Sequence, residues 1–381
     1  MKGPSDTSSA GPSRDELGDF RAALLRHYDR FRRDLPWRGE TDPYRILVSE
    51  VMLQQTRVET VLGYYEPWLE RFPTLEALAL ADSTEVLKAW EGLGYYKRAK
   101  SLHSAARLIR NLPDGRFPSK YVDLRQLPGV GQYTAGAVAS IGFGESVPAV
   151  DGNVRRVLAR LFDEPNPAAR WLNHTAAGLI DRERPGDWNQ ALMELGATIC
   201  SPKGPECEDC PIRRWCTARA QGTELLRPIG IRRVSARKAV FLLVVLQTEE
   251  GSVMLVQRPS GGLLAGMWAF PEKEMTNPQE PASACRDAAI EIAISLGAEV
   301  TGKVSALAEV RHRFTHLQAR YRPWVVPVVK LVTGVGKVWM TPGVPVDFPI
   351  PIAQQKVLTA LTQDGQSGGT VGIPARVSGC N

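Results

Sequence analysis

The sequence has 381 residues, of which 43% are hydrophobic and 23% charged, with a formal net charge of +6 and a pI near 9.0. This length predicts two domains and this composition predicts a globular protein. The longest fully apolar run, residues 239–246, is far shorter than the roughly 20 residues that a membrane-spanning helix needs. The basic excess is compatible with a polyanionic partner but does not identify one.

The first half of the chain has a helical pattern. Residues 1–14 are polar, rich in Gly, Pro and Ser, and lack the features of a secretion signal, so we expect a disordered tail. Over residues 15–219 apolar residues recur at helical spacing, which predicts an all-α domain. Residues 42–43 (DP) are a helix-start signal and predict a helix over about 44–69. A second such signal predicts a helix over 83–90.

Residues 127–135 (LPGVGQYTA) join two predicted helices. The glycines Gly129 and Gly131, spaced around Val130, allow a sharp turn and leave N–H groups at the start of the next helix unobstructed. These donors, together with the helix dipole, suit a DNA phosphate. The pattern is that of a helix–hairpin–helix motif, and an ordinary tight turn between two helices is the alternative.

Four of the six cysteines lie within seventeen residues, at Cys200, Cys207, Cys210 and Cys216. Four thiolates this close repel one another unless a cation holds them, so the spacing predicts a metal centre. A single C-x2-C with longer arms suits a [4Fe–4S] cluster at least as well as structural zinc, which usually shows two short pairs. Two disulfides are the alternative, but they form in oxidising compartments and we find no secretion signal.

The pattern changes in the second half of the chain. Residues 220–238 are basic and irregular, as expected of an interdomain linker, and residues 239–361 predict an α+β domain. Within it, residues 239–257 predict a hairpin and the Ala-rich stretch 282–296 a helix. Further strands are predicted over 304–310, 319–329 and 330–339. Residues 362–381 predict a second disordered tail.

Together, the hairpin motif, Asp151 twenty residues beyond it and the cysteine spacing resemble the endonuclease III superfamily of DNA base-excision glycosylases. Within it the chain resembles the MutY-type adenine DNA glycosylases, from about residue 16 to residue 361. The motifs that carry this resemblance are LPWR (35–38), DPY (42–44), SEVMLQQT (49–56), GLGYY (92–96), VDGNVRR (150–156) and FTH (314–316).

The resemblance implies a multi-domain fold: an all-α helix–hairpin–helix glycosylase core with a [4Fe–4S] cluster loop, followed by an α+β Nudix-like (MutT-like) domain. It implies that the four cysteines ligate the cluster. A six-helix barrel lobe over about 40–145 and a cluster lobe from 15–39 plus 146–219 would enclose the active site. Nucleotide hydrolysis by the second domain is not expected, because Ile290 stands where a Nudix helix needs a glutamate for Mg²⁺.

Breaking the N-glycosidic bond to adenine needs a proton for the leaving base and a negative charge beside the developing sugar cation. Glu50 lies among apolar residues, which predict a raised pKa. By resemblance it is the acid that protonates adenine, Asp151 stabilises the cation, and Asn153 and Tyr133 support them with hydrogen bonds. The alternatives are a helix-face ion pair for Glu50 and helix capping alone for Asp151.

Tyr133 also separates two reaction types. Lyase relatives carry a Lys here that forms a Schiff base, and Tyr cannot do so, which predicts simple hydrolysis. A base inside a duplex is reached only by flipping it out, and by resemblance Gln55 and Tyr95 fill the gap and wedge the stack. The residues implied to contact the extruded adenine are Arg33, Trp37 and Glu194. Ordinary packing or solvation is the alternative for each.

The predicted function is the removal of adenine opposite 8-oxoguanine or guanine in double-stranded DNA, leaving an abasic site. The protein would act as a monomer in the cytoplasm, associated with the nucleoid through DNA. The resemblance implies that the second domain reads 8-oxoguanine through Phe314, Thr315 and His316. A lyase for pyrimidine lesions leaves Tyr133 and the second domain unexplained, and a non-catalytic damage binder leaves Glu50 and Asp151 without a role.

Overall fold

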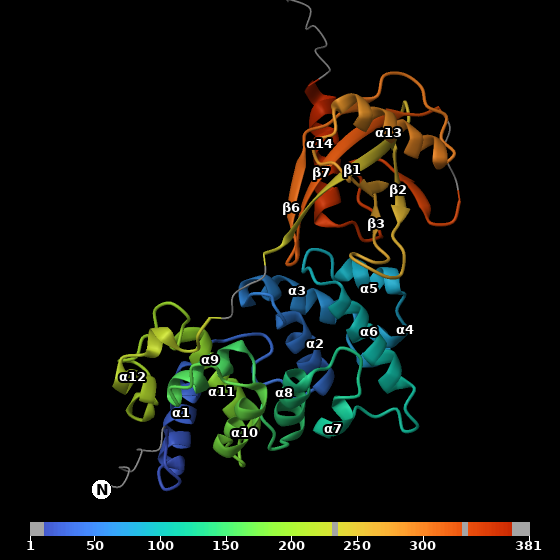
Figure 1. Cartoon of the computed structure of the whole chain (residues 1–381). Helices are drawn as coiled ribbons and strands as arrows, with labels where there is room; N and C mark the ends of the chain where they lie inside the picture. Colours follow the sequence, from blue (N-terminus) through green and yellow to red (C-terminus); the bar gives the residue numbers. More distant parts are fainter. Residues whose placement is uncertain (1–10, 231–234, 330–333, 368–381) are drawn as a thin grey trace, which may run out of the picture. The chain divides into compact units, whose positions relative to one another are not determined.

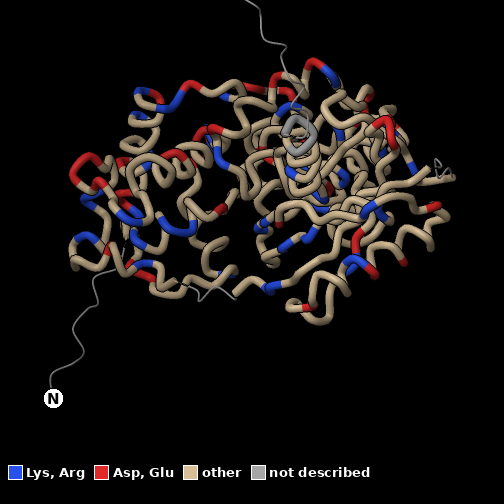
Figure 2. Tube along the Cα trace, turned by 90° about the horizontal axis from the view of Figure 1, so that it is seen from above, with Lys and Arg blue, Asp and Glu red and all other residues tan. Residues whose placement is uncertain are grey.

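The structure, a computed structural model, describes residues 11–230, 235–329 and 334–367. The chain divides into two compact units, Met1–Arg232 and Arg233–Asn381, which are described separately (Figure 1). No helix in these described ranges is both long and apolar enough to cross a membrane. Segments with Lys or Arg and segments with Asp or Glu are interspersed along the described trace (Figure 2).

The described part of the first unit is helical. Its helices are α1 (Leu17–Phe31), α2 (Pro43–Leu53), α3 (Val58–Arg71), α4 (Leu75–Leu80), α5 (Ser83–Ala89), α6 (Lys97–Arg110), α7 (Tyr121–Leu124), α8 (Gln132–Phe143), α9 (Gly152–Leu161), α10 (Ala169–Leu179), α11 (Pro185–Thr198) and α12 (Thr217–Gln221). Two short 3-10 helices, η1 (Arg213–Trp215) and η2 (Glu224–Leu226), flank α12.

The prediction of one helix over 44–69 is wrong in one respect. The structure has two helices in this range, α2 and α3. Asp42 caps α2 as expected, accepting a hydrogen bond from the Tyr44 N–H at 2.9 Å. Gln54 then leaves the helix with φ −58° and ψ 112°, and Gln55 has φ +57°. The sequence has no Gly or Pro at this break, and the apolar periodicity continues across it. The pattern therefore predicts a single helix. The helix predicted over 83–90 is confirmed as α5.

Helices α1, α9, α10 and α11 share one hydrophobic core. Phe20 of α1 lies at its centre, with ring centroids 5.7 Å from Trp188 and 5.3 Å from Trp215 in edge-on packing. The core therefore joins the N-terminal helix to segments more than 130 residues away in the sequence. In the other part of this unit α2 packs against α3, α6 and α8, and α11 contacts α8.

The second unit contains a mixed sheet. Its strands are β1 (Arg237–Gln247), β2 (Val253–Gln257), β3 (Trp268–Ala269), β4 (Glu272–Glu274), β5 (Ser305–Ala306), β6 (Val310–Arg313), β7 (Leu317–Pro327) and β8 (Lys337–Met340). Its helices are α13 (Ala282–Ser295) and α14 (Ile352–Ser367). The main strand order is β3-β2-β1-β7-β5, with β1 antiparallel to β2 and parallel to β7. The predicted hairpin and the Ala-rich helix are confirmed.

Strand β1 is apolar on both sides because a helix covers each face of the sheet. Leu242, Val244 and Leu246 share a core with α13, whereas the alternate residues Leu243 and Val245 share a core with α14. Side chains alternate between faces along a strand, so a continuous apolar run is what a sheet covered twice requires. The predicted fold class, an all-α core followed by an α+β domain, is confirmed.

The segment expected to be a linker over 220–238 is ordered in its first half. The Thr223 hydroxyl lies 2.5 Å from Asp163 Oδ1, Arg227 pairs with the same carboxylate at 2.9 Å, and the Ile229 N–H donates to the Pro165 carbonyl at 2.8 Å. Residues 223–229 therefore belong to the helical unit. The basic character of this segment predicts a linker, but the side chains of Arg227 and its partner Asp163 are only 17% and 14% exposed.

The tail boundaries also differ from the expectation. The Gly11 N–H donates to Thr217 Oγ1 at 3.2 Å, so residues 11–14 contact the helical unit. At the other end α14 continues to Ser367. The rest of both predicted tails, residues 1–10 and 368–381, and the start of the strand predicted over 330–339 lie outside the described residues.

Candidate active site and metal-ligand loop

A cavity of about 760 Å³ in the helical unit gathers most of the predicted site residues. Its walls come from the ends of α2, α8, α9 and α11 and from the segment before α2. The predicted residues that line it are Arg33, Trp37, Glu50, Gln55, Gly129, Gly131, Tyr133, Asp151, Asn153 and Glu194. Tyr95 and Val130 are not in its lining; Val130 is buried and Tyr95 is 43% exposed.

Glu50 is the buried acid of this cavity. It lies on α2, is only 6% exposed, and accepts a hydrogen bond from the Tyr133 hydroxyl. Burial, reinforced by the charge of Asp151, raises the pKa of Glu50 to about 7. Glu50 forms no ion pair within the described ranges, which argues against the helix-face alternative. Near neutral pH this carboxyl is therefore partly protonated and able to donate a proton.

Asp151 combines a capping role with a place in the cavity wall. As the N-cap of α9, its Oδ1 accepts from the Val154 N–H at 2.7 Å, and its Oδ2 accepts from Asn153 Nδ2 at 2.8 Å. Burial raises the pKa of Asp151, while these hydrogen bonds favour its ionised form. Capping is thus confirmed, and it does not remove the carboxylate from the cavity.

Tyr133 holds the Glu50 carboxyl in place. It lies in the first turn of α8, and burial raises the pKa of its hydroxyl well above the usual value, so the group stays protonated and donates. Its oxygen is also 3.5 Å from Met193 Sδ on α11. A phenol has no amine, so Tyr133 cannot form a Schiff base with the sugar.

Glu194 forms ion pairs with two arginines, Arg33 and Arg38. Its carboxylate accepts from Arg33 Nε at 2.6 Å and Nη2 at 3.1 Å, and it also pairs with Arg38. Burial opposes ionisation, but the Arg33 hydrogen bonds and the Arg38 charge hold the pKa of Glu194 below its usual value. Glu194 therefore orients two guanidinium groups of the cavity wall rather than presenting a vacant carboxylate. Arg38, which also donates to Gln190 at 2.6 Å, was not singled out from the sequence.

Arg156 is a second residue of the site that the sequence did not predict. Its Nη2 donates to Asn153 Oδ1 at 2.9 Å and to the Gly196 carbonyl at 2.7 Å, and its Nε donates to the Cys200 carbonyl at 2.8 Å. It thereby connects the hydrogen-bond partner of Asp151 to the first cysteine. The signal available was its position one helical turn after Asn153 in the VDGNVRR run.

The four clustered cysteines are half-buried free thiols, which argues against the two-disulfide alternative. Burial and the proximity of the other cysteines raise the thiol pKa values, to about 12 for Cys210. Arg160 Nη1 lies 3.2 Å from Cys200 Sγ. A cationic metal centre among these cysteines would offset the cost of burying thiolates and the repulsion between them. The four cysteines therefore fit a metal centre. Within the described chain, no three His, Cys, Asp or Glu side chains already surround a point suited to a metal ion.

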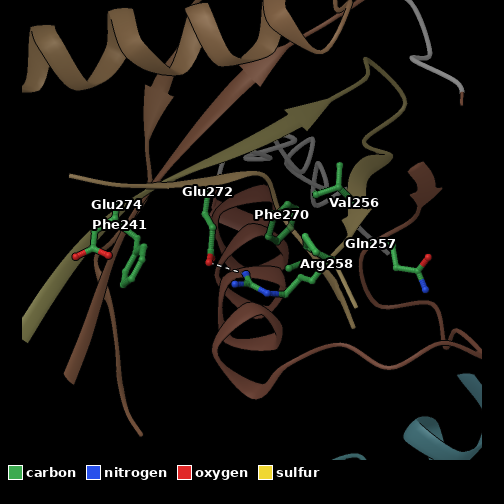
Figure 3. A pocket seen from close by; sticks show the side chains of 9 residues that line it. Phe241, Val256, Gln257, Arg258, Phe270, Glu272 and Glu274 are labelled. Carbon is green, nitrogen blue, oxygen red and sulfur yellow. Dashed lines mark hydrogen bonds and ion pairs between the residues drawn. The ribbon is translucent and has the colours of Figure 1, made fainter. Parts of the chain in front are cut away.

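The second unit has a smaller pocket of about 240 Å³ between β1, β2 and β4 (Figure 3). Arg258 pairs across it with Glu272 at 2.6 Å, and Gln354 donates to the other oxygen of Glu272 at 3.1 Å. The carboxylate of Glu272 in this pocket therefore already has partners on the protein at both of its oxygens. The predicted reading residues lie elsewhere in this unit, in the turn between β6 and β7. In that turn Phe314 packs against the core and Thr315 and His316 are exposed.

Two family profiles match the chain: "HhH-GPD superfamily base excision DNA repair protein" over residues 48–177 and "NUDIX domain" over residues 242–360. Glu50 lies within the first match. The other residues that line the cavity lie either within this match or in the segments before and after it in the sequence. A solved structure of a thermostable thymine-DNA glycosylase is 31% identical, with a TM-score of 0.51, and covers 54% of this chain and 98% of its own. The fold and site thus define a base-excision DNA glycosylase core with a Nudix domain.

The curated relatives narrow the class. Adenine DNA glycosylase of Mus musculus is 37% identical over 80% of this chain and 69% of its own length. Adenine DNA glycosylase of Homo sapiens is 37% identical over 81% of this chain and 66% of its own length. The chain belongs to the adenine DNA glycosylase family, and it spans somewhat less than two thirds of the human relative's length.

Proposed function

We propose that this protein is a monofunctional DNA glycosylase that removes adenine mispaired with 8-oxoguanine or guanine. The observation that carries the proposal is the placement of Glu50, Tyr133 and Asp151 around one cavity. It supplies an acid with a pKa near neutrality and a second carboxylate at the same centre. The family relationship supports adenine as the base, and the Nudix domain supports a separate reader for the opposite base.

The reaction follows from these groups. Protonated Glu50 gives its proton to a ring nitrogen of adenine, the bond from that base to the sugar breaks, and adenine leaves as a neutral molecule. The ionised Asp151 offsets the positive charge on the sugar. Water then adds to the sugar carbon and gives a proton to the Glu50 carboxylate, which restores the acid. Tyr133 keeps the Glu50 carboxyl oriented throughout by its hydrogen bond.

Adenine reaches these groups only after leaving the duplex. Arg33 and Trp37 line the cavity and are the side chains that we propose to contact the extruded base, with Glu194 holding Arg33. Trp37 is buried against Tyr65 at a centroid distance of 5.4 Å, so packing fixes its ring as one wall. Gln55 and Tyr95 are proposed to occupy the vacated stack.

The rate of adenine release is expected to fall as the pH rises above about 7. The active form of Glu50 is the protonated one, and its pKa is raised to about 7, so the acid is present below that pH and lost above it. The loss should approach about tenfold per pH unit on the alkaline side. Single-turnover rates between pH 6 and 9, with DNA binding measured at each pH as the control, test this; a rate that increases from pH 7 to pH 9 would contradict it.

We propose that Cys200, Cys207, Cys210 and Cys216 ligate a [4Fe–4S] cluster, which would cross-link the loop between α11 and α12. The support is the presence of four half-buried cysteines on this loop and their spacing in the sequence, one close pair with two longer arms. The loop contributes Trp215 to the core of α1, α9, α10 and α11. Its order therefore affects the packing of the helix that carries Asp151 at its start.

Replacing any of these four cysteines by Ser is expected to lower the iron content from about four per chain and to reduce the yield of folded protein. The matched control is Cys285→Ala, because Cys285 is a buried core residue of the second unit. That variant should keep its iron, although its second unit loses some packing. Stoichiometric zinc without iron in protein purified anaerobically would overturn the cluster assignment.

The second unit is proposed to read 8-oxoguanine, which predicts what its removal does. The ordered contacts of residues 223–229 place the best cut after Gly230, since a cut near Thr223 would remove the partners of Asp163. The 1–230 fragment is expected to stay folded and to release adenine, with its preference for 8-oxoguanine over guanine reduced at least about tenfold. One good bidentate contact to a base is worth about that much.

Single-turnover assays with adenine opposite 8-oxoguanine, guanine, cytosine and thymine measure this preference and also test the function itself. The full-length double variant Thr315→Ala, His316→Ala should reproduce part of the loss. Unchanged preference in the fragment would show that the second unit has another role. Efficient borohydride trapping of the wild-type protein on DNA would instead indicate a lyase.

A further inference from the structure

Arg98 is a buried cation outside the active-site cavity. It lies in the first turn of α6 and is 9% exposed. Burial lowers its pKa to about 10, so the guanidinium remains charged at neutral pH. Arg98 is not part of any ion pair found among the described residues, although a buried charge without compensation is costly. Its surroundings must therefore supply that compensation in another form.

The first part of this compensation comes from the end of α2. Arg98 Nη1 lies 2.9 Å from the Val51 carbonyl oxygen, 2.7 Å from that of Met52 and 2.6 Å from that of Gln54. The last carbonyls of a helix have no partner within the helix and carry its negative dipole end. Arg98 thus caps α2 from another helix, immediately before Gln55.

The second part comes from a different segment. Arg98 Nη2 lies 3.0 Å from Thr56 Oγ1, 3.3 Å from the Leu93 carbonyl oxygen and 3.1 Å from that of Gly94. One guanidinium therefore binds residues on both sides of Gln55 and the two residues before Tyr95. A planar fork with donors on two nitrogens can join two chain segments in this way.

Gln55 and Tyr95 share an uncommon backbone conformation. Their φ angles are +57° and +48°, in the left-handed region that non-glycine residues adopt at an energetic cost. Such conformations persist when the surrounding structure holds them. The carbon at the centre of the Arg98 guanidinium also lies 5.3 Å from the centroid of the Tyr95 ring. Arg98 thus contacts Tyr95 itself and the residues on both sides of Gln55.

We propose that Arg98 is a positioning residue that holds Gln55 and Tyr95 as one unit, so that both side chains enter the duplex together when adenine is extruded. This inference rests on the proposed function. Arg98 does not line the cavity that holds Glu50 and Asp151. Its loss should therefore slow the extrusion of the base rather than the cleavage of the bond.

Extrusion can be measured without cleavage. In full-length Glu50→Gln protein, 2-aminopurine placed opposite 8-oxoguanine reports unstacking through its fluorescence. Adding Arg98→Met should slow the fluorescence rise at least about tenfold, because a neutral side chain leaves the carbonyls of two segments unpaired. The rate of the fluorescence rise with Arg98→Lys should lie between those of Arg98→Met and the parent, since a single ammonium keeps the charge but cannot span both segments.

The matched control is Arg107→Met. Arg107 lies on the same helix and also donates to backbone carbonyls, those of Ala79 at 3.2 Å and Ala81 at 3.1 Å, but it contacts neither loop. The Arg107→Met variant should show a rate of fluorescence rise within about twofold of that of the parent. Melting temperature shows whether each variant is folded.

Two outcomes would overturn the inference. One is a fluorescence rise in folded Arg98→Met or Arg98→Lys protein as fast as in the parent. The other is loss of fold in both Arg98 variants while Arg107→Met stays folded, which would make Arg98 a structural residue only. Failure of the wild-type protein to release adenine would count against the proposed function instead, because the fluorescence signal does not depend on cleavage.

Discussion

Glu50→Gln is expected to abolish adenine release, with a loss of at least about a thousandfold in the single-turnover rate. An amide cannot give up the proton that the departing base needs. The substitution otherwise changes little, because the Gln carbonyl oxygen can still accept the hydrogen bond from Tyr133 and has nearly the same volume. Binding to DNA that holds adenine opposite 8-oxoguanine should therefore remain close to that of the wild type.

The control for this variant is Glu76→Gln, which neutralises a carboxylate on α4 that pairs with Arg110 at the surface and does not line the cavity. It should cleave like the wild type, since exposed ion pairs contribute little. If Glu50→Gln released adenine at near the wild-type rate, the acid would have to be another group and the proposed mechanism would be wrong.

Asp151→Asn is expected to lower the single-turnover rate at least about a hundredfold, because a preorganised charge beside a forming cation is worth several kcal/mol. Asn is also a good N-cap, so the hydrogen bond from the Val154 N–H can persist and α9 should remain in place. The loss should appear in the rate of bond cleavage with DNA affinity nearly unchanged, which separates charge from capping.

Asp82→Asn provides the matched comparison. Asp82 caps α5 by accepting from the Thr84 N–H at 2.7 Å, and it lies outside the cavity. The two variants make the same chemical change at the same kind of helix position, and only the one at Asp151 should affect cleavage. Equal effects on activity would mean that capping, and not charge, explains the role of Asp151.

Several parts of the site could be read from residues that are close in sequence. The apolar neighbours of Glu50 on one helix predict its burial, and burial is the main reason why its pKa is raised. The position of Asp151 before Gly152 and Asn153 predicts a helix cap, which the structure has. These properties depend on contacts within one or two turns of a helix, which periodicity and capping patterns describe.

Other parts could not be predicted in this way. The end of α2 at Leu53 has no Gly or Pro, and the structure shows Arg98 of another helix holding its last carbonyls. The partners of Glu194 lie more than 150 residues away, at Arg33 and Arg38. An arginine in a helical pattern looks like a solvated surface residue until the fold shows which acceptors surround it.

By itself the sequence determined the two-domain organisation, the helical and strand-rich halves, the apolar surroundings of Glu50 and the four-cysteine loop. These follow from local periodicity, helix signals and spacing, whereas the role of Glu50 as the acid was implied by the family resemblance. Only the tertiary structure decided where helix α2 stops, that residues 223–229 belong to the helical unit, and which arginines compensate buried carboxylates and carbonyls. The physical reason is that a charged side chain satisfies whichever polar groups the fold brings within about 3 Å, whatever their distance in sequence.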